Sequence, residues 1–208
     1  MNTTTELYPV WIRVWHWCNA LSFLALLVTG VSLHFAEPGA PLISFETARV
    51  AHNLFGILLG CGWLVFVAGN LWSRNGIHYR PRLHGLLIRL LIQGRFYGVG
   101  IFRDEPHPFP ATRDAKFNPL QQVTYLMVMY GAMPLLILSG LAFWFDGLTP
   151  ERVLGMDGLW IAGVVHYLLG LFLTLFLIGH LYLATAGETL LGEFKKMVFG
   201  STLTEEKS

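Results

Sequence analysis

The sequence predicts an all-α membrane protein, a bundle of four transmembrane helices in a single domain spanning residues 1–208. Hydrophobic residues make up 54% of the 208 residues and charged residues only 13%, whereas soluble domains carry about 25%. The shortfall comes from long uncharged runs, four of which reach the length of about 20 residues that crosses a bilayer. Histidines stand inside these apolar runs, which points to a bound cofactor rather than to a simple anchor.

The four predicted spans cover residues 11–35, 50–72, 119–145 and 159–186. The first is not expected to be a cleavable signal peptide, because its run is too long and no small-residue cleavage site follows it. In the third span Pro134, with Gly131 nearby, predicts a kink.

The largest non-spanning piece, residues 73–118, lies between the second and third spans. Its part from Leu86 to Phe102 interrupts apolar residues with Arg89 and Arg95. This pattern predicts an amphipathic helix that lies on the inner surface of the lipid bilayer. The proline-rich segment after it is expected to be extended.

The distribution of Lys and Arg predicts the orientation, because these residues concentrate on the cytoplasmic side. With the N-terminus inside, only Arg49 and Arg152 of the 14 basic residues fall outside. The inner residues are Arg13, Arg74, Arg80, Arg82, Arg89, Arg95, Arg103, Arg113, Lys116, Lys195, Lys196 and Lys207. We therefore expect a multi-pass protein of a bacterial cytoplasmic membrane with both termini in the cytoplasm.

Four histidines, His16, His52, His166 and His180, lie within the predicted spans. His166 and His180 stand 14 residues apart on one helix, which is a rise of ~21 Å with both side chains on nearly the same face. Paired neutral imidazoles on facing helices are typical axial ligands of haem iron. The alternative for any single histidine is a hydrogen bond to a neighbouring helix.

Topology sorts these histidines into two levels. His16 and His180 fall near the inner surface, and His52 and His166 fall near the outer surface, so each level holds one pair. We expect two low-spin haems, an inner one held by His16 and His180 and an outer one held by His52 and His166. Because the chain has no Cys-x-x-Cys-His motif, covalent c-type attachment is not supported.

A weak internal sequence repeat accompanies the histidines. His52 and His166 are each followed four residues later by glycine, and the first and third spans end near Thr29-Gly30 and Ser139-Gly140. A glycine one turn from a ligand leaves a flat surface that a porphyrin can approach. The alternative is that small residues let membrane helices pack closely.

Three motifs resemble one known family, the di-haem cytochrome b subunits of membrane-bound nickel–iron hydrogenases, formate dehydrogenases and thiosulfate-type reductases. They are RVWHW in the first span, FNPLQQ before the third and IGHLYLA in the fourth, and the resemblance covers all four spans. The resemblance implies a four-helix bundle holding two b-type haems through His16, His52, His166 and His180. It also implies a quinone site beside the inner haem, with Asn118 and Gln121 as candidate hydrogen-bonding residues.

Two of the candidate binding residues, Asn118 and Arg13, have structural alternatives. Asn118 is a good helix N-cap and Pro119 a good first helical residue, so FNPLQQ also reads as a helix start. Arg13, three residues before His16, is a candidate partner for a haem propionate. Its alternative role is to reach the lipid headgroups as a positive anchor.

The function expected from these features is electron transfer by a membrane anchor. The partners would be an iron–sulfur subunit and a catalytic oxidoreductase subunit on the outer face, with quinone as the substrate at the inner side and no nucleic acid. An alternative is a stand-alone quinol-dependent reductase of a small outer acceptor. A proton or metal-ion transporter with a histidine relay is disfavoured, because the apolar runs contain no acidic residue. The sequence leaves the direction of electron flow, the catalytic partner and the quinone type open.

Overall fold

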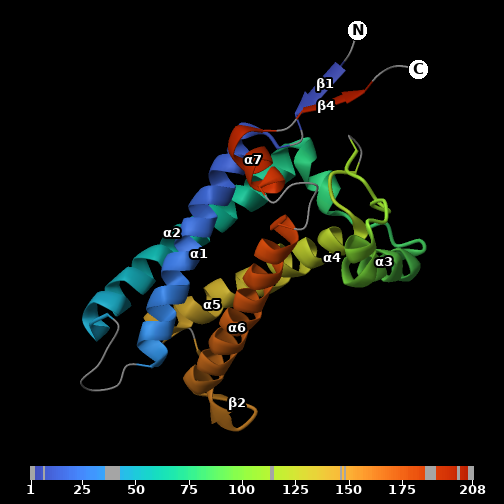
Figure 1. Ribbon diagram of the computed structural model, residues 1–208. Coiled ribbons are helices and arrows are strands. Elements are labelled where there is room, and N and C mark those ends of the chain that lie inside the picture. The colour runs from blue at the N-terminus through green and yellow to red at the C-terminus, as the bar shows by residue number, and fades with distance from the viewer. Residues whose placement is uncertain are drawn as a thin grey trace. The chain divides into compact units, whose positions relative to one another are not determined.

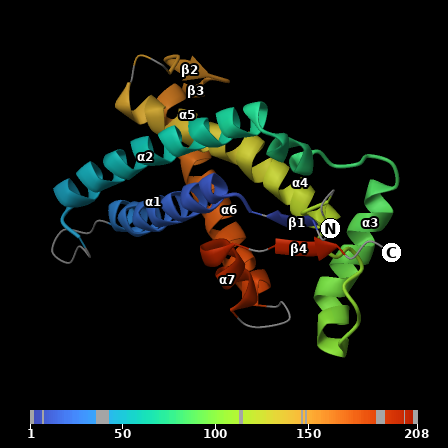
Figure 2. The same cartoon turned by 90° about the horizontal axis from the view of Figure 1, so that it is seen from above.

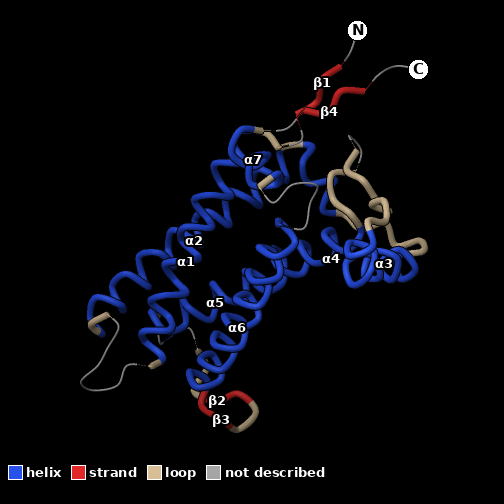
Figure 3. The backbone as a smooth tube through the Cα atoms, in the orientation of Figure 1, coloured by secondary structure: helices blue, strands red, loops and turns tan. Residues whose placement is uncertain are grey.

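The structure, a computed structural model, describes residues 3–6, 8–35, 43–112, 115–145, 147, 149–185, 191–200 and 202–205. It is predominantly helical, with short strands near the termini and in one hairpin (Figures 1 and 3). Arg113 and Lys207, on which the predicted orientation partly rests, lie outside the described residues.

Four helical segments are long and apolar enough to cross a membrane, as the sequence predicts. They are α1 (Val10–His34), α2 (Phe45–Trp72), the third span formed by α4 and α5 (Pro119–Trp144), and α6 (Gly158–Thr185). Most ends agree with the prediction to within one residue, and the all-α fold with four candidate spans is therefore confirmed.

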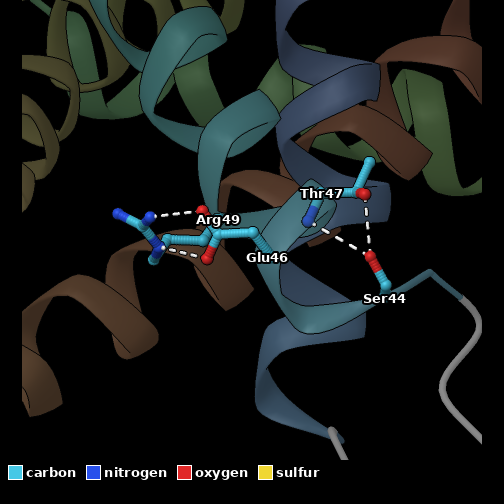
Figure 4. A network of polar contacts seen from close by, with 4 residues as sticks. All are labelled: Ser44, Glu46, Thr47 and Arg49. Carbon is cyan, nitrogen blue, oxygen red and sulfur yellow. Dashed lines mark hydrogen bonds and ion pairs between the residues drawn. The ribbon is translucent and has the colours of Figure 1, made fainter.

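The one larger difference is the start of α2, which lies five residues before the predicted position 50. Figure 4 shows the cause, a set of polar contacts in the first turn. The Ser44 hydroxyl accepts a hydrogen bond from the Thr47 amide at 3.3 Å, and Glu46 pairs with Arg49 at 2.6 Å. These side chains continue the helix beyond the apolar run.

The third span is interrupted close to the predicted kink. Helix α4 (Pro119–Met127) passes through a π-helical turn, η4 (Val128–Ala132), into α5 (Met133–Trp144). Pro134 stands at the start of α5, where its missing amide proton disturbs the regular hydrogen-bond pattern.

Polar and apolar side chains are distributed in the reverse of a soluble protein. Large apolar side chains such as Leu21, Leu138 and Ile178 are at least 60% exposed. Polar side chains such as Ser32 and Ser139 are buried between helices. Lipid-facing helices require this arrangement, because each exposed polar group would lose its hydrogen-bond partners in the hydrocarbon.

The segment between the second and third spans contains the predicted helix. It begins with the 3-10 helix η1 (Arg74–Tyr79) and continues with α3 (Leu86–Arg95), which runs on through η2 (Phe96–Gly100) and η3 (Ile101–Arg103). Leu87, Ile88 and Leu91 on α3 are 65% to 71% exposed, whereas Gln93 is fully buried. The exposed apolar face is the face that a surface helix would turn to the bilayer.

Two short antiparallel sheets were not predicted. Strand β1 (Thr3–Glu6) pairs with β4 (Thr202–Glu205), which follows α7 (Gly192–Phe199), so the two ends of the chain lie side by side (Figure 2). Strand β2 (Arg152–Val153) pairs with β3 (Met156–Asp157) in a hairpin. Its turn residues Leu154 and Gly155 both have positive φ, 51° and 81°, as a type I′ turn requires.

The chain divides into two compact units, which we call unit 1 (residues 1–13, 68–130 and 179–208) and unit 2 (residues 14–67 and 131–178). Unit 2 consists of parts of α1, α2, α5 and α6 joined by interhelical contacts. The Trp15 indole donates to the Gly62 carbonyl at 2.7 Å, and the rings of His34 and Tyr167 stack at 4.7 Å. These contacts make unit 2 a four-helix bundle.

Candidate functional site

The rings of His52 on α2 and His166 on α6 lie next to each other within unit 2. Their centroids are 6.2 Å apart and their planes are inclined by 67°. Two imidazoles bound to opposite sides of one metal ion would have centroids about 6 Å apart, given metal–nitrogen bonds of about 2 Å. The separation of the two rings is therefore that expected for the axial ligands of one iron.

Each of the two rings is hydrogen-bonded through its Nδ1 atom to a buried hydroxyl. His52 Nδ1 lies 2.9 Å from Thr29 Oγ1, and His166 Nδ1 lies 3.0 Å from Ser139 Oγ. Thr29 is 5% and Ser139 8% exposed. The Nε2 atoms are thereby left as the ring nitrogens available to a metal.

A glycine follows each hydroxyl residue and lies against the same histidine. A Cβ atom on Gly30 would stand 3.3 Å from His52 Cε1, and one on Gly140 would stand 3.2 Å from His166 Cε1. Any larger residue would push against the ring. The helix pair α1–α2 and the helix pair α5–α6 thus hold their histidines in the same way. We call the six residues of this arrangement the paired-histidine site; they are Thr29, Gly30, His52, Ser139, Gly140 and His166.

The donor set of the paired-histidine site fits haem better than a bare metal ion. Among the residues that the structure describes, no three His, Cys, Asp or Glu side chains converge on one point. A bare ion would therefore find at most two protein ligands here, whereas haem needs only two because the porphyrin supplies four nitrogens. Gly56 and Gly170 lie one turn beyond the two histidines. A Cβ atom added at either glycine would have no neighbouring atom within 4 Å, so the space beside both is open.

The second predicted pair, His16 and His180, is divided between the two units. His16 belongs to α1 in unit 2, where its ring meets Trp17 edge-on with centroids 5.3 Å apart. His180 belongs to α6 in unit 1. Their pairing around a haem stays a prediction from helix depth and from the family resemblance.

Several buried amide side chains belong to unit 1. Asn75 donates to Asn70 at 2.7 Å, and Gln122 donates to the His78 carbonyl at 3.2 Å. Asn118 Nδ2 donates to the Tyr97 hydroxyl at 2.7 Å. We call this set the amide cluster; its members are Asn70, Asn75, Gln93, Tyr97, Asn118 and Gln122, and all but Tyr97 are at most 9% exposed.

Asn118 and Gln121 form the helix start that was the structural alternative in the sequence. Asn118 Oδ1 accepts from the Gln121 amide at 2.9 Å, and Gln121 Oε1 accepts from the Asn118 amide at 3.1 Å. This reciprocal capping box begins α4, with Pro119 as the first helical residue. The cap is thus observed, and a quinone role for either residue stays a prediction.

Tyr97 is a member of the amide cluster that the sequence reasoning missed. Its hydroxyl accepts the Asn118 amide and keeps its own proton available for donation. Burial raises the pKa of the Tyr97 phenol, and the hydrogen bond with Asn118 opposes this rise. The hydroxyl therefore stays protonated at physiological pH. No sequence signal marked this residue, because its contact with Asn118 depends on the fold.

Arg13 interacts with backbone in unit 1. Its Nε atom donates to the Tyr8 carbonyl at 3.1 Å and its Nη1 atom to the Val198 carbonyl at 2.9 Å. The guanidinium thereby connects the start of α1 to α7. A haem propionate as a further partner stays a prediction.

The chain is similar to known cytochromes. The sequence model of the family described as prokaryotic cytochrome b561 matches residues 7–200. The chain is 45% identical to "Putative cytochrome YdhU" of Escherichia coli (strain K12), over 93% of this chain and 73% of that protein. It is 24% identical to "Probable Ni/Fe-hydrogenase B-type cytochrome subunit" of Cupriavidus necator, over 86% of this chain and 78% of that protein. A protein of the same name from Rhizobium leguminosarum bv. viciae is 26% identical, over 67% of this chain and 59% of that protein.

Proposed function

Because this chain belongs to the prokaryotic cytochrome b561 family, in which the bound group is a b-type haem, we propose that it carries electrons across a membrane through two such haems. The observation that carries the proposal is the 6.2 Å separation of the His52 and His166 rings, with each Nδ1 bonded to a hydroxyl. These two residues hold one haem. His16 and His180 hold the second, at the other membrane surface.

Bound haem supplies reversible one-electron transfer between ferric and ferrous iron. The residues of this chain fix how that chemistry is used. When haem is bound, His52 and His166 would both ligate its iron, which would suit the site to electron transfer rather than to binding of oxygen or substrate. The apolar helices around them exclude water, which keeps the site to electron transfer.

Quinone is the proposed substrate, at the amide cluster on the cytoplasmic side. Asn118, Gln121 and Tyr97 offer amide and phenol groups that can hydrogen-bond the two oxygens of a quinone. Arg13 lies in the same unit as a candidate partner for a haem propionate. The polar residues here can exchange protons with the cytoplasm, which the apolar surroundings of His52 and His166 do not permit.

The proposed partners are an iron–sulfur subunit and a catalytic oxidoreductase subunit on the outer face. Two relatives bear names of hydrogenase cytochrome subunits, and the 45% identical relative bears a name that specifies no partner. The partner is therefore proposed by chemical class, as a hydrogenase, formate dehydrogenase or sulfur-compound reductase. The proposed location is the bacterial cytoplasmic membrane with both termini inside, and the pairing of β1 with β4 supports an even number of crossings.

A pyridine haemochrome assay and an optical spectrum of the purified chain test the proposal. We expect two b-type haems per polypeptide. His52→Ala and His166→Ala should each remove the same haem and leave the other, and His34→Ala serves as a control histidine on α1. A well-folded protein without Soret absorbance would eliminate the redox function, and loss of different haems in the two variants would eliminate the pairing.

A second candidate function is a stand-alone reductase that passes electrons from quinol to a small outer acceptor. The site for such an acceptor would be the open, mostly apolar depression of unit 2 that is lined by His34, Trp160 and Tyr167. Purification separates the two functions. Iron–sulfur and catalytic subunits that co-purify support the anchor, whereas quinol-dependent reduction by the isolated chain supports the reductase.

A further inference from the structure

The hydroxyl groups of Thr29 and Ser139 have a defined direction of hydrogen bonding. Thr29 Oγ1 lies 2.8 Å from the Ala25 carbonyl oxygen, and Ser139 Oγ lies 3.0 Å from the Leu136 carbonyl oxygen. A carbonyl oxygen can only accept, and a hydroxyl has a single proton to donate. Each hydroxyl therefore gives its proton to its own helix and accepts one from the histidine.

The tautomer of both histidines follows from this direction. Nδ1 of His52 and of His166 must carry the proton that is donated to Thr29 and to Ser139. The unprotonated nitrogen of each neutral ring is then Nε2, which holds the lone pair that a metal requires.

Two other hydroxyls in unit 2 show that the contact with histidine is not a general property of membrane helices. Ser22 donates to the Cys18 carbonyl at 2.9 Å, and Thr174 donates to the Gly170 carbonyl at 2.8 Å. Such bonds to the preceding turn are common for Ser and Thr in helices. Only Thr29 and Ser139 of these four add a histidine Nδ1 as a second partner, and both are followed by a glycine that touches the same ring.

We propose that Thr29 and Ser139 are positioning residues that fix the iron-binding tautomer of His52 and His166 and lower the redox potential of the haem between them. This inference rests on the proposed function, because it requires that the two histidines bind haem iron. An Nδ1–H that donates to an oxygen makes Nε2 a stronger electron donor. A stronger donor favours ferric over ferrous iron, and the potential falls.

Redox titration of Thr29→Val, Ser139→Ala and the double variant tests the inference, with optical detection of both haems. Each single variant should raise the midpoint potential of the haem that His52→Ala removes and leave the other haem unchanged. The expected change in the ratio of ferric to ferrous affinity is roughly threefold to tenfold, and tenfold corresponds to about 59 mV. Because His52 and His166 themselves are unchanged in these variants, haem should be retained.

Matched variants separate this effect from helix packing. Thr174→Val and Ser22→Ala remove hydroxyls that serve only the helix backbone, and they should leave both potentials unchanged. Thr29→Ser and Ser139→Thr keep the acceptor oxygen and should keep the wild-type potential and the ferric low-spin electron paramagnetic resonance signal. If Thr29→Val does not fold, Ser139→Ala provides the same comparison on the other helix pair.

The two possible failures are distinguishable. Unchanged potentials and spectra in a double variant that binds both haems would overturn the role of the hydroxyls while leaving haem ligation intact. Absence of haem from the wild-type protein would instead refute the proposed function.

Discussion

The paired-histidine site and the amide cluster are built from opposite kinds of side chain. The paired-histidine site has two imidazoles, two hydroxyls and two glycines. Each imidazole is hydrogen-bonded to a hydroxyl and contacted by a glycine of its own helix pair. The amide cluster has a phenol and several amides, which can donate and accept hydrogen bonds in several directions. The first arrangement suits an electron carrier that excludes protons, and the second suits a substrate whose reduction consumes protons.

This difference extends to the backbone around the two sites. The histidines and their hydroxyl partners stand in long regular helices, α1, α2, α5 and α6. The amide cluster is assembled from a helix end, a 3-10 helix, α3 and a capping box. Regular helices hold ligands at fixed spacing, whereas irregular segments expose the backbone and side-chain groups that bind polar ligands.

The largest expected effect is on the paired-histidine site and comes from its glycines. In Gly30→Ala and Gly140→Ala the new methyl group would meet a histidine ring at 3.3 Å and 3.2 Å, closer than ordinary contact. The ring must move, so we expect haem affinity at this site to fall roughly 10-fold to 100-fold, as for other changes to the surroundings of metal ligands. Haem content per chain, measured by pyridine haemochrome, checks this expectation.

Gly60→Ala is the matched control for the glycine variants. Its added Cβ would lie 3.7 Å from Ile137, an ordinary contact, on the same α2 helix that carries His52. It should bind both haems. Full haem content in Gly30→Ala and Gly140→Ala would show that the rings have more room than their contacts indicate.

The next effect concerns Asn118, in which helix capping and quinone binding can be separated. Asn118→Ala removes the cap and should lower the free energy of unfolding by about 1 kcal/mol. Asn118→Asp keeps an oxygen that accepts the Gln121 amide but loses the Nδ2 donor to Tyr97. Thermal unfolding in detergent should therefore distinguish the two variants.

Both Asn118 variants should also slow haem reduction by a soluble quinol. The expected decrease is about 3-fold to 10-fold, the worth of one hydrogen bond. Reduction at the wild-type rate in a stably folded Asn118→Asp would assign this residue to capping alone. Met127→Leu, at an exposed side chain of α4, provides a control within the same helix and should leave the rate unchanged.

A smaller effect is expected from Tyr97→Phe, which removes only the hydroxyl that accepts from Asn118. Quinol-dependent haem reduction should fall about 3-fold, since one hydrogen bond of ordinary strength is lost. The haem spectrum and both midpoint potentials should not change. Tyr167→Phe, in unit 2, serves as the matched control, and an equal loss of rate in it would remove Tyr97 from the quinone site.

The sequence predicted the parts of the molecule that depend on one helix at a time. The spans follow from apolar runs, and the depth of His52 and His166 follows from position along a run. The early start of α2 was missed because Glu46 and Arg49 end the apolar run while their ion pair continues the helix. The pairing of β1 with β4 was missed because it joins opposite ends of the chain.

The side-chain contacts at both sites depend on how helices are rotated about their axes. The sequence showed Thr29-Gly30 and Ser139-Gly140 as a repeated pair of residues. It could not show that the two hydroxyls face Nδ1 of the histidines. The contact of Tyr97 with Asn118 likewise joins α4 to the π-helical turn after α3. Rotation is set by packing across helices, which a pattern along one helix does not record.

The smallest expected effect is a pH dependence of stability that comes from an exposed ion pair beside the amide cluster. Arg95, next to this cluster on α3, forms two hydrogen bonds with Glu105 at 2.7 Å and 2.8 Å, which lower the pKa of that carboxyl. A carboxyl whose pKa is lower in the folded state stabilises the fold above its unfolded pKa and loses this contribution as pH falls through the folded value. Thermal unfolding of Arg95→Gln should therefore differ slightly from wild type at neutral pH, and the difference should shrink below about pH 4.

Arg49→Gln breaks a comparable exposed pair in α2 and should leave quinol-dependent reduction unchanged at every pH. A pH dependence in the potential of the His52–His166 haem, rather than near α3, would contradict the division of the molecule into a proton-excluding site and a proton-exchanging one.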